Sequence, residues 1–316
     1  TLHTGETLPY TKLVLATGAQ ARTLPDTIGG TLGNVHVMRT LADADALTAK
    51  MVAGKRLVVI GGGYIGLEAA AEARKKDMDV TVIEAAPRIL QRVACAETSD
   101  AFRAIHTGKG VDIREATGCA RIIGDDNGNA AAVETTDGSQ IACDLVIVGI
   151  GIIPNVLLAA QAGLRVEGAI VVDAQGRTTD PDIYACGDNT LLPFDNQPTR
   201  LESVQNANDQ AVVVARNVLG ASETYAPMPW FWSDQYDVKL QIAGFNRGYT
   251  DVIVRPGKRE GSVSHFYFDG DRFIAVDCLN DAATYAMSRK ILTEGKTLTQ
   301  AQVADPAFVL KSVLAA

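Results

Sequence analysis

The sequence contains little that points to metal binding, disulfide exchange or hydrolysis. Its five cysteines occur singly, without a Cys-x-x-Cys pair, and its four histidines are equally dispersed. Metal sites and redox dithiols both need closely placed ligands, so neither is predicted, and the cysteines are expected to be small buried side chains. A Gly-x-Ser-x-Gly turn is also absent, so the sequence offers no hydrolase nucleophile of that type.

Nucleic acids and membranes are not predicted as partners. The balance of 29 Lys+Arg against 37 Asp+Glu gives a net charge of -8, which repels phosphate backbones and anionic membrane surfaces. No apolar run is long enough to span a bilayer, and residues 1–20 do not resemble a signal peptide. With 47% hydrophobic residues over 316 positions, the composition is typical of a cytoplasmic protein with two or three folded domains.

One segment carries a complete nucleotide-binding pattern. The apolar run Arg56–Ile60 predicts a strand, Gly61-Gly-Gly-Tyr-Ile-Gly66 follows it, and an amphipathic helix is predicted over Leu67–Lys76. A second strand is predicted at Asp79–Glu84, so that an acidic residue ends it. A Gly-rich turn without a ligand is the alternative, but this strand-turn-helix-strand context favours a dinucleotide site.

The glycines have distinct expected roles. Gly61 permits a tight turn, Gly63 lets the backbone approach a pyrophosphate, and Gly66 lets the helix pack closely on the strand. The N–H groups that begin the helix are expected to bind the anion.

The residue after the second strand bears on the choice of coenzyme. Glu84 stands where a carboxylate accepts hydrogen bonds from the adenosine ribose hydroxyls, and it would repel a 2′-phosphate. The following Ala85-Ala86-Pro87 supplies no cation, although Arg88 and Arg92 are close enough to leave NADPH open. NADH is therefore favoured over NADPH.

Hydrophobic periodicity and turn residues predict the remaining elements. Asn127-Gly128 and Asp137-Gly138 mark hairpins, which suggests a β-meander crossover within the nucleotide-binding unit. The C-terminal part is expected to be a small antiparallel sheet with helices. The further predicted elements are a strand-turn-strand at Leu2–Leu8, strands at Lys12–Ala16 and Asp144–Gly149, helices from Asp43 to about Ala53, from Glu97 to about Lys109 and from about Ser203 to Leu219, and strands at Val238–Ile242, Thr250–Arg255, Val263–Phe268 and Phe273–Val276.

Several motifs in this order carry a family resemblance. They are Gly61-Gly-Gly-Tyr-Ile-Gly-Leu-Glu68, Gly149-Ile-Gly-Ile-Ile-Pro-Asn155, Tyr184-Ala-Cys-Gly-Asp188, Arg200-Leu-Glu-Ser-Val204 and Pro229-Trp-Phe-Trp-Ser-Asp-Gln235. The chain resembles the FAD-dependent ferredoxin reductases of bacterial oxygenase systems, the relatives of putidaredoxin reductase and of aromatic-ring dioxygenase reductases.

The resemblance implies an α/β flavoprotein with two dinucleotide-binding, Rossmann-like domains for FAD and NAD and a small α+β C-terminal domain. The expected boundaries are 1–33 for a first part of the FAD domain, 34–155 for the NAD domain, 156–225 for the second part of the FAD domain and 226–316 for the C-terminal domain. Family members begin with a Gly-rich FAD fingerprint about a hundred residues earlier. We expect that segment to be missing here, together with the lysine that partners the Glu68-type carboxylate, and the chain alone to retain little FAD and to be inactive.

The resemblance also assigns cofactor contacts. Asp188 could accept hydrogen bonds from the ribitol, although a Gly-Asp pair is often only a turn, and Ser203 could start a helix aimed at the flavin or simply cap it. The FAD contacts implied are Ala16, Thr17, Gly18, Arg39, Asp188, Glu202, Ser203 and Val204. The NAD contacts implied are Gly61, Gly62, Gly63, Tyr64, Ile65, Gly66, Glu84, Arg92 and Gly151.

Two residues are expected to act at the reacting centre. By resemblance, Glu68 lies where nicotinamide meets flavin, although an acid in the first turns of a helix is favourable in itself. Trp232 belongs to the cluster Trp230-Phe231-Trp232, which could be core; by resemblance it lies at the flavin edge, facing the protein acceptor.

The function predicted is that of an NADH:ferredoxin oxidoreductase, which passes electrons from NADH through FAD to a [2Fe–2S] ferredoxin. Such chemistry needs no side-chain nucleophile. The alternatives left open are a related disulfide reductase or NADH oxidase, and a non-catalytic NAD-binding fragment.

Overall fold

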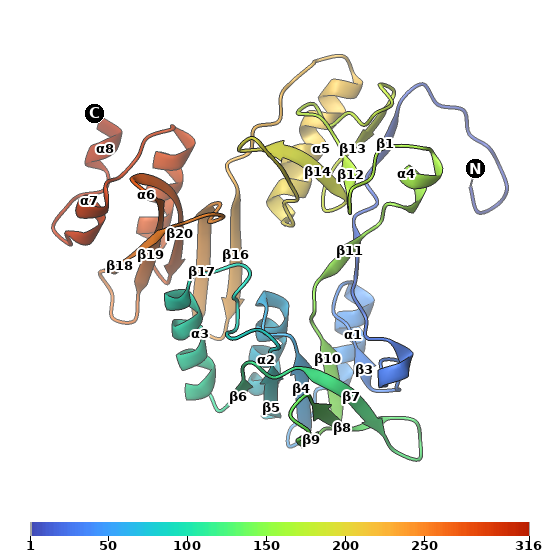
Figure 1. Cartoon of the computed structure of the whole chain (residues 1–316). Helices are drawn as coiled ribbons and strands as arrows, with labels where there is room; N and C mark the ends of the chain where they lie inside the picture. Colours follow the sequence, from blue (N-terminus) through green and yellow to red (C-terminus); the bar gives the residue numbers. More distant parts are fainter. Residues whose placement is uncertain (1, 316) are drawn as a thin grey trace. The chain divides into compact units, whose positions relative to one another are not determined.

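The computed structural model describes residues 2–315, and its contacts divide the chain into two compact units. Unit 1 comprises Thr1–Gln20 and Ile152–Phe231, and unit 2 comprises Ala21–Gly151 and Trp232–Ala316. The chain passes from one unit to the other at three places, in β2 (Ala19–Ala21), at the start of β11 (Ile152–Pro154) and within β16 (Trp230–Gln235) (Figure 1). Within the described part, no helix is both long enough and apolar enough to cross a bilayer.

A five-stranded parallel sheet forms the centre of the first part of unit 2. Its strand order is β3 (Val35–His36), β10 (Leu145–Val148), β4 (Arg56–Ile60), β5 (Asp79–Ile83) and β6 (Asp112–Arg114). Alternate residues of β4 enter two different core clusters, with Leu57 and Val59 in one and Val58 and Ile60 in the other. Both faces of the sheet are therefore covered, as the continuous apolar run of β4 requires.

Helices cover one face of this sheet and a meander covers the other. The cluster that contains Leu57 also includes side chains from α1 (Leu41–Lys50), α2 (Tyr64–Lys75) and α3 (Ala96–Gly108). The opposite cluster includes side chains of the antiparallel strands β7 (Cys119–Gly124), β8 (Ala130–Thr135) and β9 (Gln140–Ala142). The β-meander crossover predicted from its Asn-Gly and Asp-Gly turns is confirmed.

The second part of unit 2 is an antiparallel sheet followed by helices. Its strand order is β16 (Trp230–Gln235), β17 (Val238–Gly244), β20 (Arg272–Leu279), β19 (Val263–Asp269) and β18 (Asp251–Pro256), and the helices are α6 (Ala282–Thr293), α7 (Gln300–Ala304) and α8 (Ser312–Ala315). The guanidinium of Arg255 on β18 donates to backbone carbonyls at and after the end of α7, those of Gln302, Val303, Asp305, Pro306 and Phe308. These bonds satisfy acceptors that the short helix leaves open.

Unit 1 contains a parallel strand pair and one long helix. β1 (Leu13–Leu15) pairs with β13 (Ile183–Ala185), and α5 (Val204–Val218) packs against β13. α5 begins after the N-cap Ser203 and ends before Gly220, which has a φ of 96°, as predicted from the sequence. The remaining elements are α4 (Leu157–Gln161), β12 (Ile170–Val171), β14 (Thr190–Phe194) and β15 (Gln197–Thr199); the short 3-10 helix η1 (Asp26–Ile28) belongs to unit 2.

Three local predictions were wrong. Leu2–Leu8 forms a turn closed by Leu2 N–H on the Glu6 carbonyl at 2.7 Å and contains no strand, because this exposed segment has no sheet to pair with. α1 starts at Leu41 and ends at Lys50, because Asp43 occupies the third helical position of a capping box with Thr40. α2 starts earlier than predicted, at Tyr64, with Gly63 as its N-cap.

A buried polar cluster joins α3 to the antiparallel sheet. Thr98 on α3 donates to Asp277 Oδ2 at 2.7 Å and lies 2.8 Å from His265 Nδ1, while Tyr267 donates to the same carboxylate oxygen. Asp277 is fully buried, and its Oδ1 has no hydrogen-bond partner among residues 2–315. Burial raises the pKa of Asp277 to about 6, because the two hydroxyl donors do not offset the loss of solvent.

We predict that the wild-type protein gains stability relative to Asp277→Asn as the pH falls from 8 to 5. The pKa of Asp277 rises on folding from 3.8 to about 6, so the folded state takes up a proton in this range while the unfolded state does not. The gain is complete below the unfolded pKa and is lost as the pH rises through the folded one.

Thermal unfolding of both proteins at several pH values measures this difference. Asp271→Asn, in the exposed turn between β19 and β20, is the matched control and should follow the wild type at every pH. A difference between wild type and Asp277→Asn that is the same at pH 8 and pH 5 would contradict the assignment.

Candidate nucleotide-binding site

The turn after β4 is held by close backbone contacts that only glycine permits. A Cβ atom on Gly61, whose φ is 111°, would lie 2.4 Å from the carbonyl oxygen of Gly149, and one on Gly66 would lie 2.0 Å from the carbonyl oxygen of Gly61. Gly149 directly follows β10, which pairs in parallel with β4. The carboxyl ends of β4 and β10 therefore meet at this turn, which is where open α/β sheets bind ligands.

Gly63 differs from its neighbours because it faces open space. It is the N-cap of α2 and has no side chain to occupy the helix start, and no atom lies within 4 Å of the position of its absent Cβ. The first N–H groups of a helix have no acceptor within the helix. An anionic group can approach the backbone at this point and be bound by the start of α2.

The Glu84 carboxylate is fixed by the same turn. Its Oε2 accepts from the Gly62 N–H at 2.7 Å, and its Oε1 accepts from the Ala86 N–H at 2.7 Å. Each oxygen keeps a further acceptor site. The side chain is therefore already oriented and can still accept hydrogen bonds from hydroxyl groups.

The structure assigns different contacts to Arg88 and Arg92, the two arginines that could have bound the 2′-phosphate of NADPH. The guanidinium of Arg88 donates to the carbonyls of Cys95 and Ala94 and to Ser99 Oγ, at 3.1, 2.8 and 2.5 Å. Arg88 therefore holds its own loop onto α3. The Arg92 guanidinium comes within 3.8 Å of the Cβ position of Gly151, which brings these two predicted contacts together.

Glu68 lies on α2, two residues beyond the fingerprint. Its Oε1 accepts from Ser233 Oγ at 2.5 Å, which is a contact with β16. This contact was not predicted, although Ser233 belongs to one of the motifs that carry the family resemblance. Burial raises the pKa of Glu68, the Ser233 hydroxyl partly offsets this, and the charges of Asp234 and Glu72 add to the rise. The pKa of the Glu68 carboxyl group therefore lies nearer to neutral pH than that of an exposed glutamate.

Trp232 lies beside Ser233 on β16, a strand that the sequence did not predict. Successive residues of a strand point to opposite faces. Because Ser233 points toward Glu68, Trp232 lies on the other face of β16, where it is half-buried. Glu68 and Trp232 therefore face opposite sides of β16.

In unit 1, the predicted flavin contacts gather at one edge. β1 and β13 are parallel, so Ala16, Thr17 and Gly18 after one strand and Asp188 after the other follow neighbouring carboxyl ends. Thr17 Oγ1 accepts from the Asn189 amide at 2.8 Å. Asn189 is fully buried, and its Oδ1 has no partner within residues 2–315, so this edge contains a buried acceptor that a ligand hydroxyl or a water would satisfy.

The start of α5 lies beside the same edge. A Cβ on Gly187 would lie 3.7 Å from that of Ala207 in the second turn of α5. Ser203 Oγ caps the helix by accepting from the Asn206 N–H at 3.1 Å, Val204 is exposed, and the Glu202 carboxylate pairs with Arg200 at 2.6 Å. These residues fit the flavin end of FAD, since the start of α5 and the carboxyl ends of β1 and β13 meet there.

Arg39, the remaining predicted flavin contact, belongs to unit 2. It is exposed just before α1, and its backbone N–H donates to Asp43 at 3.1 Å. Its role stays a prediction.

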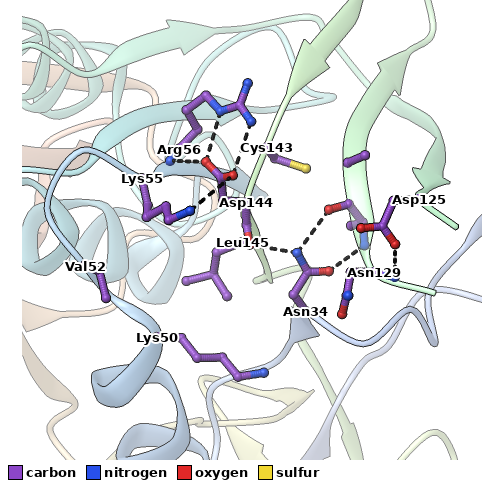
Figure 2. A pocket seen from close by; sticks show the side chains of 12 residues that line it. Asn34, Lys50, Val52, Lys55, Arg56, Asp125, Asn129, Cys143, Asp144 and Leu145 are labelled. Atoms are coloured by element: carbon purple, nitrogen blue, oxygen red, sulfur yellow. Dashed lines mark hydrogen bonds and ion pairs between the residues drawn. The ribbon is translucent and has the colours of Figure 1, made fainter. Parts of the chain in front are cut away.

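Figure 2 shows a hollow of about 530 Å³ at the other end of the parallel sheet. It lies at the amino ends of β4 and β10, and its polar groups are bonded to one another: Arg56 pairs with Asp144 through two bonds, and Asn34 bonds the Ala130 and Asp144 backbones. The hollow is therefore separate from the fingerprint. Within the described residues, no group of three or more His, Cys, Asp or Glu side chains is placed to hold a metal ion.

We predict that Gly63→Ala weakens NADH binding, whereas Gly66→Ala lowers the stability of the fold. Gly63→Ala should fold like the wild type but bind NADH at least tenfold more weakly, because its methyl group enters the space that the pyrophosphate needs. Gly66→Ala should lower the melting temperature by several degrees, because its Cβ would meet the Gly61 carbonyl.

Thermal unfolding and calorimetric titration with NADH measure both effects. Gly108→Ala, at the end of α3, is the matched control, because the backbone of Gly108 is not left-handed and no neighbour lies within 4 Å of its Cβ position. It should leave NADH binding unchanged. Undiminished NADH affinity in Gly63→Ala would show that the anion is bound elsewhere.

Comparisons with known proteins agree with this geometry. The family model described as pyridine nucleotide-disulphide oxidoreductase matches residues 1–211, and the one described as reductase C-terminal matches residues 230–314. A ferredoxin–NAD(P)+ reductase of Sphingomonas sp. is 45% identical over 98% of this chain and 75% of its own length.

Two crystal structures are similar along most of the chain. The ferredoxin reductase for the CYP199A2 system from Rhodopseudomonas palustris has a TM-score of 0.94 and 42% identity, covering 98% of this chain and 77% of that one. The covalent putidaredoxin reductase–putidaredoxin complex has a TM-score of 0.94 and 39% identity, covering 99% and 76%. The chain therefore belongs to the pyridine nucleotide-disulphide oxidoreductase family and carries the reductase C-terminal domain.

Proposed function

We propose that this protein is an NADH:ferredoxin oxidoreductase that passes electrons from NADH through FAD to a [2Fe–2S] ferredoxin. The observation that carries the proposal is the fingerprint turn of unit 2, where open space at Gly63 stands beside a carboxylate fixed by Gly62. Relatives named as ferredoxin reductases, and the similarity to a reductase bound to putidaredoxin, support the acceptor class.

Unit 2 supplies the nucleotide site in this proposal. The start of α2, from Gly61 to Gly66, binds the pyrophosphate, Glu84 binds the adenosine ribose, and Arg92 with Gly151 borders the site. NADH is the coenzyme because the carboxylate disfavours a 2′-phosphate, and because Arg88 is committed to Cys95, Ala94 and Ser99.

Unit 1 supplies the flavin contacts. Asp188 and Thr17–Gly18 would hold the ribitol side, and the start of α5 at Ser203 would place its positive end near the ring. When bound, FAD supplies the conversion between two-electron and one-electron transfer. The protein contributes position and electrostatics, with Glu68 on the nicotinamide side and Trp232 on the acceptor side.

Two alternatives are less well supported. A disulfide reductase needs a reactive thiolate, and none of the five cysteines of this chain is placed to supply one: all are free, four are buried, and burial raises the pKa values of Cys95 and Cys143 to about 11. A non-catalytic NAD-binding protein would not need the buried acceptor at Asn189 or the helix start beside it.

The five unpaired cysteines bear on the location of the protein. Unpaired cysteines are usual in reducing compartments, which supports a cytoplasmic location.

We predict that Glu84→Ala narrows the preference for NADH over NADPH about tenfold, which corresponds to about 1.4 kcal/mol. The side chain accepts hydroxyl hydrogen bonds that only NADH offers in full, and its charge repels the phosphate of NADPH. The ratio of kcat/KM for the two coenzymes in the flavin-loaded enzyme measures this effect.

Asp79→Asn is the matched control, because Asp79 is an exposed carboxylate at the opposite end of the same strand. Its coenzyme ratio should equal that of the wild type. An unchanged ratio in Glu84→Ala would remove this residue from the ribose site.

We predict that the flavin-loaded enzyme reduces a [2Fe–2S] ferredoxin and ferricyanide but not glutathione disulfide or oxidised thioredoxin.

Trp232→Ala should slow ferredoxin reduction severalfold while leaving ferricyanide reduction nearly unchanged, because a small acceptor does not need the protein-facing surface. Rapid turnover of either disulfide would overturn the proposed function, and equal slowing with both acceptors would remove only the role of Trp232.

A further inference from the structure

A chain of hydrogen-bonded side chains leads from the turn after β16 to Glu68. Tyr236 OH lies 3.2 Å from His106 Nδ1, and His106 Nε2 lies 2.7 Å from Gln235 Oε1. Gln235 Nε2 donates to Ser233 Oγ at 3.0 Å, and Ser233 donates to Glu68 Oε1 at 2.5 Å. The chain thus connects α3, β16 and α2 within unit 2.

The hydrogen bonds of this chain all have the same direction. Since the amide nitrogen of Gln235 donates to Ser233, its oxygen must accept, and His106 Nε2 therefore carries a proton. Burial lowers the pKa of His106, so the ring is neutral and its Nδ1 accepts from Tyr236. Each donor in turn points toward Glu68, whose carboxylate accepts at the end.

Rearranging the middle of this series of hydrogen bonds would cost free energy, because its side chains are buried. Ser233 is 1% exposed, and Gln235 and His106 are 0% exposed. Turning the Gln235 amide over would require the His106 proton to move to Nδ1, and it would leave two acceptors, Gln235 Oε1 and Glu68 Oε1, facing the single hydroxyl proton of Ser233. One of these acceptors would then lose its partner, and an unmade buried hydrogen bond costs about 1–3 kcal/mol. Tyr236 is held at the outer end with a φ of 57°, a conformation that non-glycine residues rarely adopt, and its ring contacts His106 edge to face at 5.0 Å.

Among residues 2–315, the group that favours a charged Glu68 is the Ser233 hydroxyl. The other groups around this carboxyl oppose its ionisation: Asp234 on β16 and Glu72 on α2 carry like charges, and burial removes solvent. The hydroxyl of Tyr64, also on α2, is buried, and burial raises its pKa, so it stays neutral. The charge of Glu68 therefore depends on a donor whose own orientation is set by Gln235 and His106.

We propose that His106, Gln235 and Ser233 are positioning residues that keep the Glu68 carboxylate ionised and oriented toward the nicotinamide. This inference rests on the proposed function, since it places the nicotinamide beside Glu68. An ionised carboxylate there favours the positively charged oxidised nicotinamide over the neutral reduced one. The hydrogen-bonded side chains thereby bias coenzyme binding toward NAD⁺, and so favour the transfer of hydride from NADH to the flavin.

The test is the affinity for NAD⁺ and for NADH as a function of pH, measured by calorimetry. In the wild type, NAD⁺ binding should weaken relative to NADH as the pH falls through the pKa of Glu68. Ser233→Ala should move this transition upward by about one pH unit, because the carboxylate loses a charge-assisted hydrogen bond. Ser233→Thr, which keeps the hydroxyl, should restore the wild-type profile.

Further variants separate positioning from simple packing. Gln235→Met should shift the transition in the same direction as Ser233→Ala, but less. Glu68→Gln should abolish the transition, and adding Ser233→Ala to it should change nothing further. Thr107→Ala, the exposed neighbour of His106 on α3, is the matched control and should behave like the wild type.

A measurement on the unaltered protein covers the case in which a variant does not fold. Nitrogen-15 NMR of the His106 ring should show the neutral form protonated at Nε2, and a proton on Nδ1 instead would reverse the chain and overturn the inference. An unshifted transition in folded Ser233→Ala and Gln235→Met would also overturn it. If the wild type binds neither coenzyme, the proposed function itself fails, so the two failures are distinguishable.

Discussion

The contact between three glycine backbones sets the geometry of the nucleotide-binding part. Gly66 lies against the Gly61 carbonyl, and Gly61 lies against the Gly149 carbonyl, at distances that no Cβ would allow. This contact brings the start of α2 onto the carboxyl ends of β4 and β10. The open side of Gly63, the bond from Gly62 to Glu84 and the position of Glu68 on α2 all depend on it, because each is fixed to the same rigid turn.

Two buried polar connections attach α3 to the antiparallel sheet that follows. Thr98 bonds Asp277 at one end of the helix, and His106 bonds Gln235 at the other. The apolar core also crosses this boundary, since Leu240 and Leu279 belong to the cluster that contains Phe102. These contacts explain why the nucleotide-binding part and the C-terminal sheet form one compact unit, and why a residue of β16 can act on Glu68. The four domain segments predicted from the sequence, with three boundaries between them, stay a prediction.

The sequence predicted those features that depend on local patterns. The fingerprint, the meander turns and α5 with its Ser203 cap are all encoded by residues close together in the chain. Contacts between distant segments were not predictable in this way. Ser233 and Glu68 are 165 positions apart, and neither has a pattern that names the other. Arg88 could equally have reached a phosphate, and only the folded loop shows that carbonyls and Ser99 occupy its guanidinium.

In the proposed function, the turn from Gly61 to Gly66 binds the dinucleotide together with Glu84. The most direct measurement is a titration of the nitrogen-15 labelled protein with NAD⁺, followed through its backbone amide resonances. We expect the largest shifts at Gly62, Gly63, Tyr64 and Ile65 and at Ala85 and Ala86. Shifts confined to the residues around the hollow of Figure 2, such as Asn34 and Lys55, would contradict it.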